Sequence, residues 1–296
     1  MRTEKKTTMK KIVYAILMLI ATQQVVLAQQ LETFEENGKY GIKETGGKIL
    51  VPARYAEIYI FSEGMAMVSD GELYGYIDRT GKEVIAIQYT EATSFSEGLA
   101  SVSNGSAWGY IDKTGKTVLP FEYDEGNSFN EGLAFVSQYG YAGAIDKTGK
   151  VVIPMIYDYG ISFSQGLAVV EKEGYAGIID MRGNFVVPMK YLEIDEFSQG
   201  FAAVNKDNKW GYINRQGVEI IKPEYDYAFA FSEGLAGITI GDKGGYIDLQ
   251  GNIVIPLIYD KLGQFINGHS LVELNGKQFY INTRGNCVDY EGVSCK

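Results

Sequence analysis

Three sets of side chains in this sequence could carry chemistry, and each recurs at a fixed spacing of 34 residues. A row of carboxylates at constant spacing could hold cations or supply an acid–base pair for hydrolysis. A row of aromatic rings could stack on sugars or on an extended peptide. The first set is an acidic column with the members Asp78, Asp112, Asp146, Asp180 and Asp248, and with Asn214 and Asn282 as amides.

This acidic column is best explained by a hairpin turn. Asp112 lies three residues before Gly115, and the Asp-Lys-Thr-Gly segment separates two runs rich in aromatic and β-branched residues. A carboxylate in such a turn accepts hydrogen bonds from its own backbone amides, and the glycine takes a positive φ. Asn214 suits this role equally well, whereas the loss of charge would weaken a calcium site. We therefore predict turns at these positions.

A second acidic column allows the same interpretation, because amides replace acids in it too. Its members are Glu63, Glu97, Glu131 and Glu233, with Gln165, Gln199 and Asn267. The single histidine, His269, stands where other repeats have leucine, with no Ser or Cys motif tied to it. A catalytic pair needs one repeat that differs from the others, and no repeat carries such a cluster. The sequence predicts no catalytic residue, no metal site and no cofactor, and hence a protein that is not an enzyme.

The third set is aromatic and lies on one face of the first strand of each repeat. Seven of its members are the candidate ligand-binding residues Trp108, Tyr110, Trp210, Tyr212, Tyr74, Tyr76 and Tyr246. Two consecutive repeats depart from the pattern, with Ala144 and Ile178. Exposed rings would form a binding platform in two patches, whereas rings buried between adjacent repeats would hold the array together. The sequence leaves both interpretations open.

These side chains are positioned by a repeat array. The period of 34 residues continues without insertion or deletion, which indicates units that bury their apolar surface only against their neighbours. Within one unit, strands are predicted at Trp108–Asp112, Lys116–Pro120 and Leu133–Val136. Regularly spaced glycines and a proline column exclude a helical repeat of the same length. We predict an all-β array of three-stranded antiparallel meanders stacked as an open twisted solenoid, with a closed β-propeller as the alternative.

Comparison between repeats predicts which strand faces are buried. Alanine and valine are nearly constant at the positions of Ala134 and Val136, while the residue between them varies. Because alternate side chains of a strand point to opposite faces, the constant pair should face the core, and the variable residue should face outward or a neighbouring unit. The constant glycine of the first strand, such as Gly143, is expected to face alanine across the sheet. It would leave space there for the tyrosine and phenylalanine columns.

The two ends of the chain differ from the array. Residues 1–28 combine lysines, the apolar run Ile12–Ile20 and small residues near Ala28, which is the pattern of a signal peptide cleaved after Ala28. The run is shorter than the roughly 20 apolar residues of a membrane span. The array then covers residues 29–285 as seven full units with terminal half units. The tail, residues 286–296, contains Cys287 and Cys295, which could form a disulfide in an exported protein or stay free.

Charge narrows the range of partners. Residues 1–28 contain five of the 27 basic and one of the 37 acidic residues, so the remaining chain has a net charge of −14. An acidic surface argues against nucleic acid or anionic lipid as the partner. It is compatible with cationic partners and with neutral glycans.

Several motifs together resemble the WG-repeat family, also called KWG repeats. They are the aromatic–glycine pairs Trp108-Gly109 and Trp210-Gly211, the Ile-Asp-Lys-Thr-Gly turn, the Val-Ile-Pro strand, the Tyr-Asp dipeptide and the Phe-Ser-Glu-Gly-Leu-Ala turn. The resemblance covers the chain from about Phe34 to Gly285. It implies an exported or surface-associated bacterial repeat protein and adds little about chemistry.

The leading hypothesis is a non-catalytic, monomeric scaffold that is exported to the periplasm, the cell surface or the medium. It would bind an envelope protein or a polysaccharide. The alternative is a carboxylate-dependent glycan hydrolase, which would need two carboxylates roughly 5–10 Å apart in a cleft.

Overall fold

The computed structural model describes residues 31–295, so the predicted signal peptide lies outside the described residues. These residues form 31 β-strands and no helix, arranged as eight antiparallel sheets. We number the sheets 1 to 8 in chain order. The chain divides after Phe121, inside β11, into two compact units, which are described separately below.

Sheet 1 has three strands, and each of the others has four. Sheets 1 to 4 consist of β1 (Leu31–Glu36), β2 (Lys39–Glu44) and β3 (Ile49–Tyr55); β4 (Glu57–Ile58), β5 (Met65–Ser69), β6 (Tyr74–Asp78) and β7 (Glu83–Tyr89); β8 (Glu91–Ala92), β9 (Leu99–Ser103), β10 (Trp108–Asp112) and β11 (Thr117–Tyr123); and β12 (Glu125–Gly126), β13 (Leu133–Gln138), β14 (Tyr141–Asp146) and β15 (Val151–Tyr157). Sheets 5 to 8 consist of β16 (Tyr159–Gly160), β17 (Leu167–Lys172), β18 (Tyr175–Asp180) and β19 (Phe185–Tyr191); β20 (Glu193–Ile194), β21 (Phe201–Lys206), β22 (Lys209–Asn214) and β23 (Glu219–Tyr225); β24 (Tyr227–Ala228), β25 (Leu235–Ile240), β26 (Lys243–Asp248) and β27 (Ile253–Tyr259); and β28 (Lys261–Leu262), β29 (His269–Leu274), β30 (Lys277–Asn282) and β31 (Cys287–Val288).

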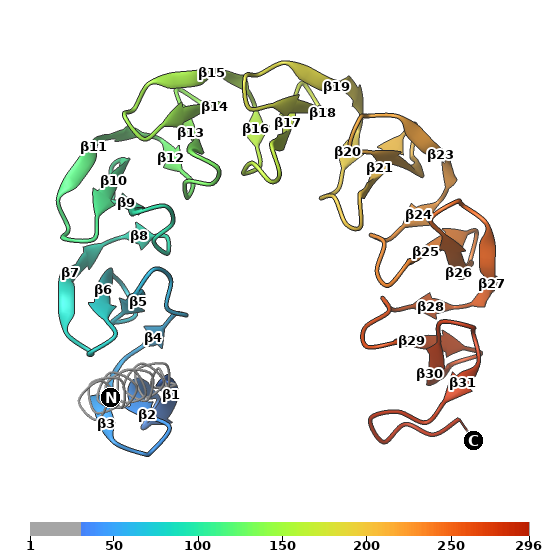
Figure 1. The fold of residues 1–296 in the computed structure, drawn as a ribbon, viewed down its shortest axis with the longest axis horizontal. Coiled ribbons are helices and arrows are strands. Elements are labelled where there is room, and N and C mark those ends of the chain that lie inside the picture. The colour runs from blue at the N-terminus through green and yellow to red at the C-terminus, as the bar shows by residue number, and fades with distance from the viewer. Residues whose placement is uncertain (1–30, 296) are drawn as a thin grey trace, which may run out of the picture. The chain divides into compact units, whose positions relative to one another are not determined.

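The predicted meander of three antiparallel strands is confirmed, and a two-residue strand is added to it. In sheet 4 the order is β12-β13-β14-β15, so the short strand and the seven-residue strand form opposite edges (Figure 1). The short strand lies in the connection for which the sequence predicts a loop. Every strand pairs only inside its own sheet, and within each unit the sheets are stacked in chain order. The all-β stack of 34-residue units is therefore as predicted.

The register of the sheets differs in one detail from the expectation. Gly143 lies opposite Val136, and Ile145 lies opposite Ala134, so the constant glycine does not face alanine. The space above the glycine is also not filled by the tyrosine and phenylalanine columns, contrary to the expectation. On the other side of β14, Ala142 pairs with Tyr157 and Ala144 pairs with Ile153, so a bulge interrupts the pairing.

This bulge explains why glycine recurs in the first strand. A Cβ atom added to Gly143 would lie 2.5 Å from the carbonyl oxygen of Ile153, and at Gly211 it would lie 2.5 Å from that of Ile221. The backbone of the bulged strand, and not the tyrosine and phenylalanine side chains, occupies this space. A residue with a Cβ would force the two strands apart.

The acidic column forms turns, as predicted. Asp112 Oδ1 accepts hydrogen bonds from the backbone amides of Thr114, at 2.9 Å, and Lys116, at 3.1 Å. Asn214 Oδ1 accepts the equivalent pair from Gln216 and Val218, both at 3.0 Å. Gly115 has a φ of 84°, a left-handed value that side chains with a Cβ rarely adopt.

Both faces of an interior sheet are buried against its neighbours. In unit 2, Ala168 and Val170 of sheet 5 pack back against sheet 4, next to Phe135. The alternate residues Val169 and Ile178 pack forward against sheet 6, next to residues such as Ala202. The constant face of one sheet thus meets the variable face of the sheet before it, and the variable residues face a neighbouring unit.

The first and last sheets differ from the interior ones at the two ends of the array. In sheet 1, β1 takes the place of the third strand of a full unit, and Phe34 lies opposite Gly41 as Val68 lies opposite Gly75. At the other end, Cys287 and Cys295 form a disulfide across the tail. His269 stacks on Tyr290 of this tail, with ring centroids 4.1 Å apart. His269 therefore contributes to the packing of the C-terminal tail against the last sheet.

Candidate functional site

The predicted aromatic platform is largely inside the protein. Five of the seven rings are at most 6% exposed, namely Tyr76, Tyr110, Tyr212, Tyr246 and Trp210. Tyr74 and Trp108 are half-buried. A stacking surface needs exposed rings, so the five buried ones correspond to the alternative interpretation, packing between adjacent repeats.

Three of the buried tyrosines, Tyr76, Tyr212 and Tyr246, join their sheet to the next one. The ring of Tyr212 in sheet 6 lies 4.7 Å from that of Phe231 in sheet 7, and its hydroxyl donates to the carbonyl oxygen of Phe229 at 2.8 Å. Burial raises the pKa of this phenol, because the charged form would lose its hydration. Apolar packing and a satisfied hydroxyl together make this contact a junction between repeats.

The same junction recurs in other repeats. The hydroxyl of Tyr76 donates to the carbonyl oxygen of Thr93 at 2.7 Å, and that of Tyr246 donates to the carbonyl oxygen of Gly263 at 2.9 Å. In each case the acceptor is 17 residues after the tyrosine. Burial raises the pKa of Tyr246 to about 12, against a smaller opposite effect of its hydrogen bond with Ser270. The aromatic column is therefore part of the fold.

The two repeats that lack this tyrosine differ in how the space of its ring is filled. In sheet 4, Ala144 takes the tyrosine position, and the large Phe135 of the neighbouring strand fills the space. The ring of Phe135 is stacked on that of Phe163 in sheet 5, with centroids 5.5 Å apart. A Cβ atom at Gly160 would clash with this ring, so the glycine there makes room for it. Sheet 4 thus keeps a filled interface.

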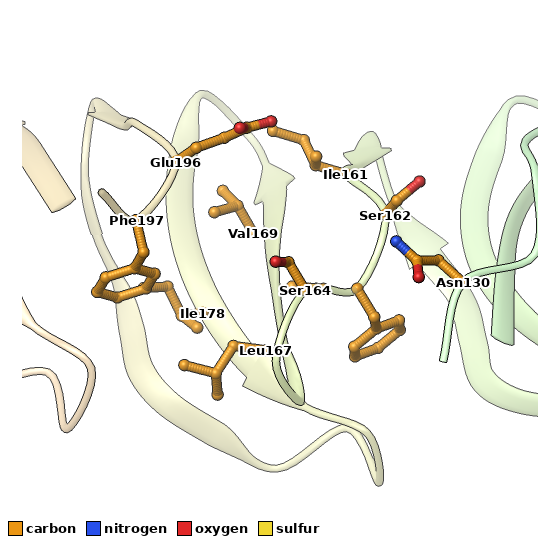
Figure 2. Close-up of a pocket in the computed structure, with 11 residues that line it drawn as sticks. Asn130, Ile161, Ser162, Ser164, Leu167, Val169, Ile178, Glu196 and Phe197 are labelled. Atoms are coloured by element: carbon orange, nitrogen blue, oxygen red, sulfur yellow. The ribbon is translucent and has the colours of Figure 1, made fainter. Parts of the chain in front are cut away.

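Sheet 5 does not fill the space, and a cavity results. Ile178 takes the tyrosine position, and Val169 stands where sheet 4 has Phe135. The cavity measures about 290 Å³ and reaches the surface. Figure 2 shows Phe197 and Ile178 side by side at one end and Glu196 next to Ile161 at another. The lining residues are Asn130, Ile161, Ser162, Phe163, Ser164, Leu167, Ala168, Val169, Ile178, Glu196 and Phe197.

The polar groups of this cavity lie among an apolar lining. Glu196 is the one carboxylic acid among the residues that line it. The neighbouring Asp195 has a pKa raised to about 6, first by burial and then by the charges of Glu193 and Glu196. Arg215 lies over the ring of Phe197, with its guanidinium carbon 4.8 Å from the ring centroid. The cavity is therefore suited to binding an apolar group more than to acid–base chemistry by a carboxylate pair.

Exposed tyrosines gather on a different part of sheets 4 and 5. Tyr141, Tyr159 and Tyr175 are 51%, 51% and 49% exposed, respectively. Tyr141 and Asp158 line an open hollow of about 360 Å³ together with Glu173, and Asp158 and Tyr159 line a smaller one beside it. Asp158 is held in place by the backbone amide of Glu173, which donates to its Oδ2 at 2.6 Å. We call these five residues the tyrosine surface.

Sequence reasoning did not select the tyrosine surface or the cavity. The signal for the first was present, because Tyr141 and Tyr175 occupy a column in which later repeats have Lys209, Lys243 and Lys277. The signal for the cavity was the coincidence of Ile178 and Val169 in one repeat. That signal has meaning only when the two strands are known to place these residues against the same neighbour.

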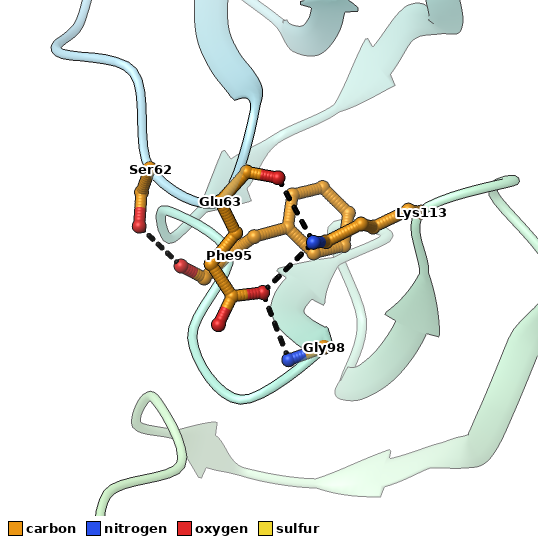
Figure 3. A network of polar contacts seen from close by, with 5 residues as sticks. All are labelled: Ser62, Glu63, Phe95, Gly98 and Lys113. Atoms are coloured by element: carbon orange, nitrogen blue, oxygen red, sulfur yellow. Dashed lines mark hydrogen bonds and ion pairs between the residues drawn. The ribbon is translucent and has the colours of Figure 1, made fainter. Parts of the chain in front are cut away.

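The second acidic column acts between repeats, which corrects its assignment to its own turn. Glu63 Oε2 accepts the backbone amide of Gly98, in the next repeat, at 3.0 Å, and it lies 3.1 Å from Nζ of Lys113 (Figure 3). The hydroxyl of Ser62 donates to the carbonyl oxygen of Phe95 at 2.7 Å (Figure 3). Glu233 repeats the first contact on Gly268 at 2.8 Å in unit 2. These carboxylates join successive turns.

Two absences hold for residues 31–295. No group of three or more His, Cys, Asp or Glu side chains is placed there to hold a metal ion. No helix in this part of the chain is long and apolar enough to cross a membrane.

A family model described as WG containing repeat matches seven consecutive stretches of the chain. They are residues 40–74, 74–106, 108–141, 143–175, 177–210, 210–243 and 245–277. No curated protein matches the chain.

Among solved structures, the crystal structure of a eukaryotic initiation factor is similar with a TM-score of 0.55 and 12% identity, over 88% of this chain and 84% of that chain. Hsv2 of Kluyveromyces lactis gives a TM-score of 0.43 and 11% identity, over 71% of this chain and 86% of that chain. At such identity the first likeness concerns the fold alone.

Proposed function

Because the chain belongs to the WG-repeat family, whose model matches nearly all of residues 40–277, we propose that it is a non-catalytic repeat scaffold. Its role is to bind a neutral glycan strand at the cell envelope. The observation that carries the proposal is the tyrosine surface of sheets 4 and 5. It is a group of exposed aromatic rings on a stack whose other aromatic residues are mostly buried.

The chemistry of the tyrosine surface fits a sugar. Exposed tyrosines offer a flat apolar ring with a polar tip, and sugar rings offer an apolar face surrounded by hydroxyl groups. Asp158 and Glu173 provide carboxylate oxygens next to the rings as hydrogen-bond acceptors. A net charge of −14 for residues 29–296 disfavours anionic polymers, which leaves neutral glycans as the best match.

Export and the lack of catalysis are parts of the same proposal. Residues 1–28 have the pattern of a signal peptide, which supports a place in the periplasm or outside the cell. A glycan hydrolase of the usual kind needs two carboxylic acids in a cleft, and the cavity of sheet 5 is lined by one, Glu196. The tyrosine surface has two, Asp158 and Glu173, but they line an open hollow, and the Asp158 carboxylate already accepts the backbone amide of Glu173 at 2.6 Å. These observations favour a scaffold over the hydrolase alternative.

Retention on immobilised neutral polysaccharides (cellulose, chitin and mannan) tests the proposal. The triple variant Tyr141→Ala, Tyr159→Ala, Tyr175→Ala should lose at least tenfold in retention on the polysaccharide that holds the unchanged protein. Its Tm should stay the same, because these rings are half exposed. Tyr227→Ala is the matched control, since Tyr227 occupies the column of Tyr159 two sheets later and is 47% exposed.

The proposal fails if the triple variant is retained as well as the unchanged protein. It also fails if none of the three polysaccharides retains the protein while a pull-down from envelope extracts captures a protein through the same three tyrosines.

A further inference from the structure

The cavity of sheet 5 has the place and surroundings of a missing tyrosine ring. In sheets 2, 6 and 7 this position holds Tyr76, Tyr212 and Tyr246. Each ring lies against a phenylalanine of the next sheet, at 4.9, 4.7 and 4.9 Å between centroids. The equivalent phenylalanine of the next sheet in the present case is Phe197, and it lines the cavity.

The partner of the missing hydroxyl can also be identified. In the three filled interfaces the phenol donates to the backbone carbonyl 17 residues further along, in Thr93, Phe229 and Gly263. The residue 17 positions after Ile178 is Asp195. By repeat position, Phe197 therefore corresponds to the ring's packing partner, and the backbone carbonyl of Asp195, the residue before Glu196 of the lining, corresponds to the acceptor of the hydroxyl.

From this geometry we propose that the cavity between sheets 5 and 6 binds a small para-substituted phenol. The ring lies against Phe197 and Val169, and the hydroxyl donates to the backbone carbonyl of Asp195. Seven of the eleven residues that line the cavity are apolar, and there is room for an aromatic ring, since a cavity of about 150 Å³ lined by aliphatic and aromatic residues can hold benzene. The cavity here, at about 290 Å³, is larger.

The size of the ligand follows from Ile178. Its side chain occupies the start of the path by which a tyrosine of this repeat would enter the interface, so the para substituent must be short. A methyl or ethyl group fits this condition, whereas the backbone of a tyrosine residue in a peptide does not. The site shares no residue with the tyrosine surface, and the inference does not depend on the proposed glycan binding.

Binding of p-cresol to the full mature chain, measured by isothermal titration calorimetry, tests the inference. We expect one site per chain and a Tm that rises with p-cresol concentration, because the ligand binds only the folded state. Toluene has the same shape without the hydroxyl and should bind at least threefold more weakly, since it leaves the carbonyl unpaired. N-Acetyl-tyrosinamide, which carries the same ring on a peptide unit, should not bind at this site.

Two variants locate the site independently. Ile178→Tyr supplies the ring from the chain itself and should reduce p-cresol affinity at least tenfold. Val169→Phe fills the same space as Phe135 does in sheet 4 and should have the same effect, so the result does not depend on one variant folding. Tyr246→Ile should create a second site in sheet 7 and raise the stoichiometry from one to two.

Three results would overturn the inference. They are p-cresol binding that is unchanged in both cavity-filling variants, toluene binding as tight as p-cresol binding, and binding of N-acetyl-tyrosinamide in preference to p-cresol. A negative result here would leave the polysaccharide test unaffected, because that test concerns other residues.

Discussion

Removal of the Tyr212 hydroxyl should weaken the contact between sheets 6 and 7 measurably. In the folded chain this hydroxyl donates to the carbonyl oxygen of Phe229 at 2.8 Å, and the side chain is fully buried. Tyr212→Phe would leave that half-buried carbonyl without its partner. The expected loss in the free energy of unfolding is about 1–3 kcal/mol, the cost of an unsatisfied buried polar group.

Truncation of the whole ring should cause a larger loss in the free energy of unfolding than removal of the hydroxyl. Tyr212→Ala also deletes the ring that packs on Phe231 at 4.7 Å. Large aromatic residues truncated to alanine in a core cost about 3–5 kcal/mol. The difference between the two variants therefore separates the hydrogen bond from the packing. Tyr227→Phe is the control, because this half-exposed hydroxyl should change stability by less than about 0.5 kcal/mol.

Urea unfolding followed by tryptophan fluorescence suits this measurement. Trp210 lies in the same interface, against Tyr227 at 5.6 Å, so one of the two tryptophans reports the contact directly. In a stack of repeats, a weakened interface can separate local from global unfolding, and circular dichroism recorded in parallel detects this. The assignment of Tyr212 to the interface is refuted if Tyr212→Ala is no more destabilising than the Tyr227→Phe control.

Three further outcomes can be measured on the same protein. Gly211→Ala should cost about 1–3 kcal/mol by urea unfolding, because a Cβ there would lie 2.5 Å from the Ile221 carbonyl oxygen; an unchanged midpoint would mean that the bulge does not close over the glycine. Cys287→Ser should cost about 2–3 kcal/mol in the stability of the C-terminal end, the loop entropy of a short disulfide loop, and should increase amide exchange in β31; equal exchange would show that the bond is dispensable. Asp195 has a folded pKa of about 6, above its ordinary 3.8, so its contribution to stability is present below pH 4 and is lost as the pH rises through 6. Asp195→Asn should therefore be more stable than the unchanged chain at pH 7, by on the order of 1 kcal/mol, and the Tm difference should disappear towards pH 4; a constant difference across this range would contradict the assignment.

The fold was predictable because its determinants are local and are repeated many times. The turn at Asp112 depends on a side chain that bonds its own backbone and on a glycine with a φ of 84°, and both leave a direct mark in the sequence. The variable residues alternate with constant ones along the strand, so the two faces could be distinguished. Their packing forward onto the next sheet was one of the two predicted options.

The candidate site was less predictable because burial depends on what lies above each sheet. Alternation in a strand shows that two faces differ, yet in a stack of sheets both faces are buried. The ring of Tyr212 therefore gives the same sequence signal whether it stacks on a ligand or on Phe231. Tyr141 and Tyr175 stand out from the lysines of their column, but only the structure shows that both are exposed and that Tyr141 lines a hollow with Asp158.

By itself the sequence determined the repeat length, the strands, the turns and the resemblance to the WG-repeat family, since these follow from spacing along one chain. The tertiary structure decided the register that puts Gly143 opposite Val136, and it decided which rings are buried. It also decided that Ala144 is compensated by Phe135 while Ile178 leaves a cavity. The physical reason is that a void between two sheets depends on the summed volumes of side chains from different strands, and the sequence of a single repeat does not contain that sum.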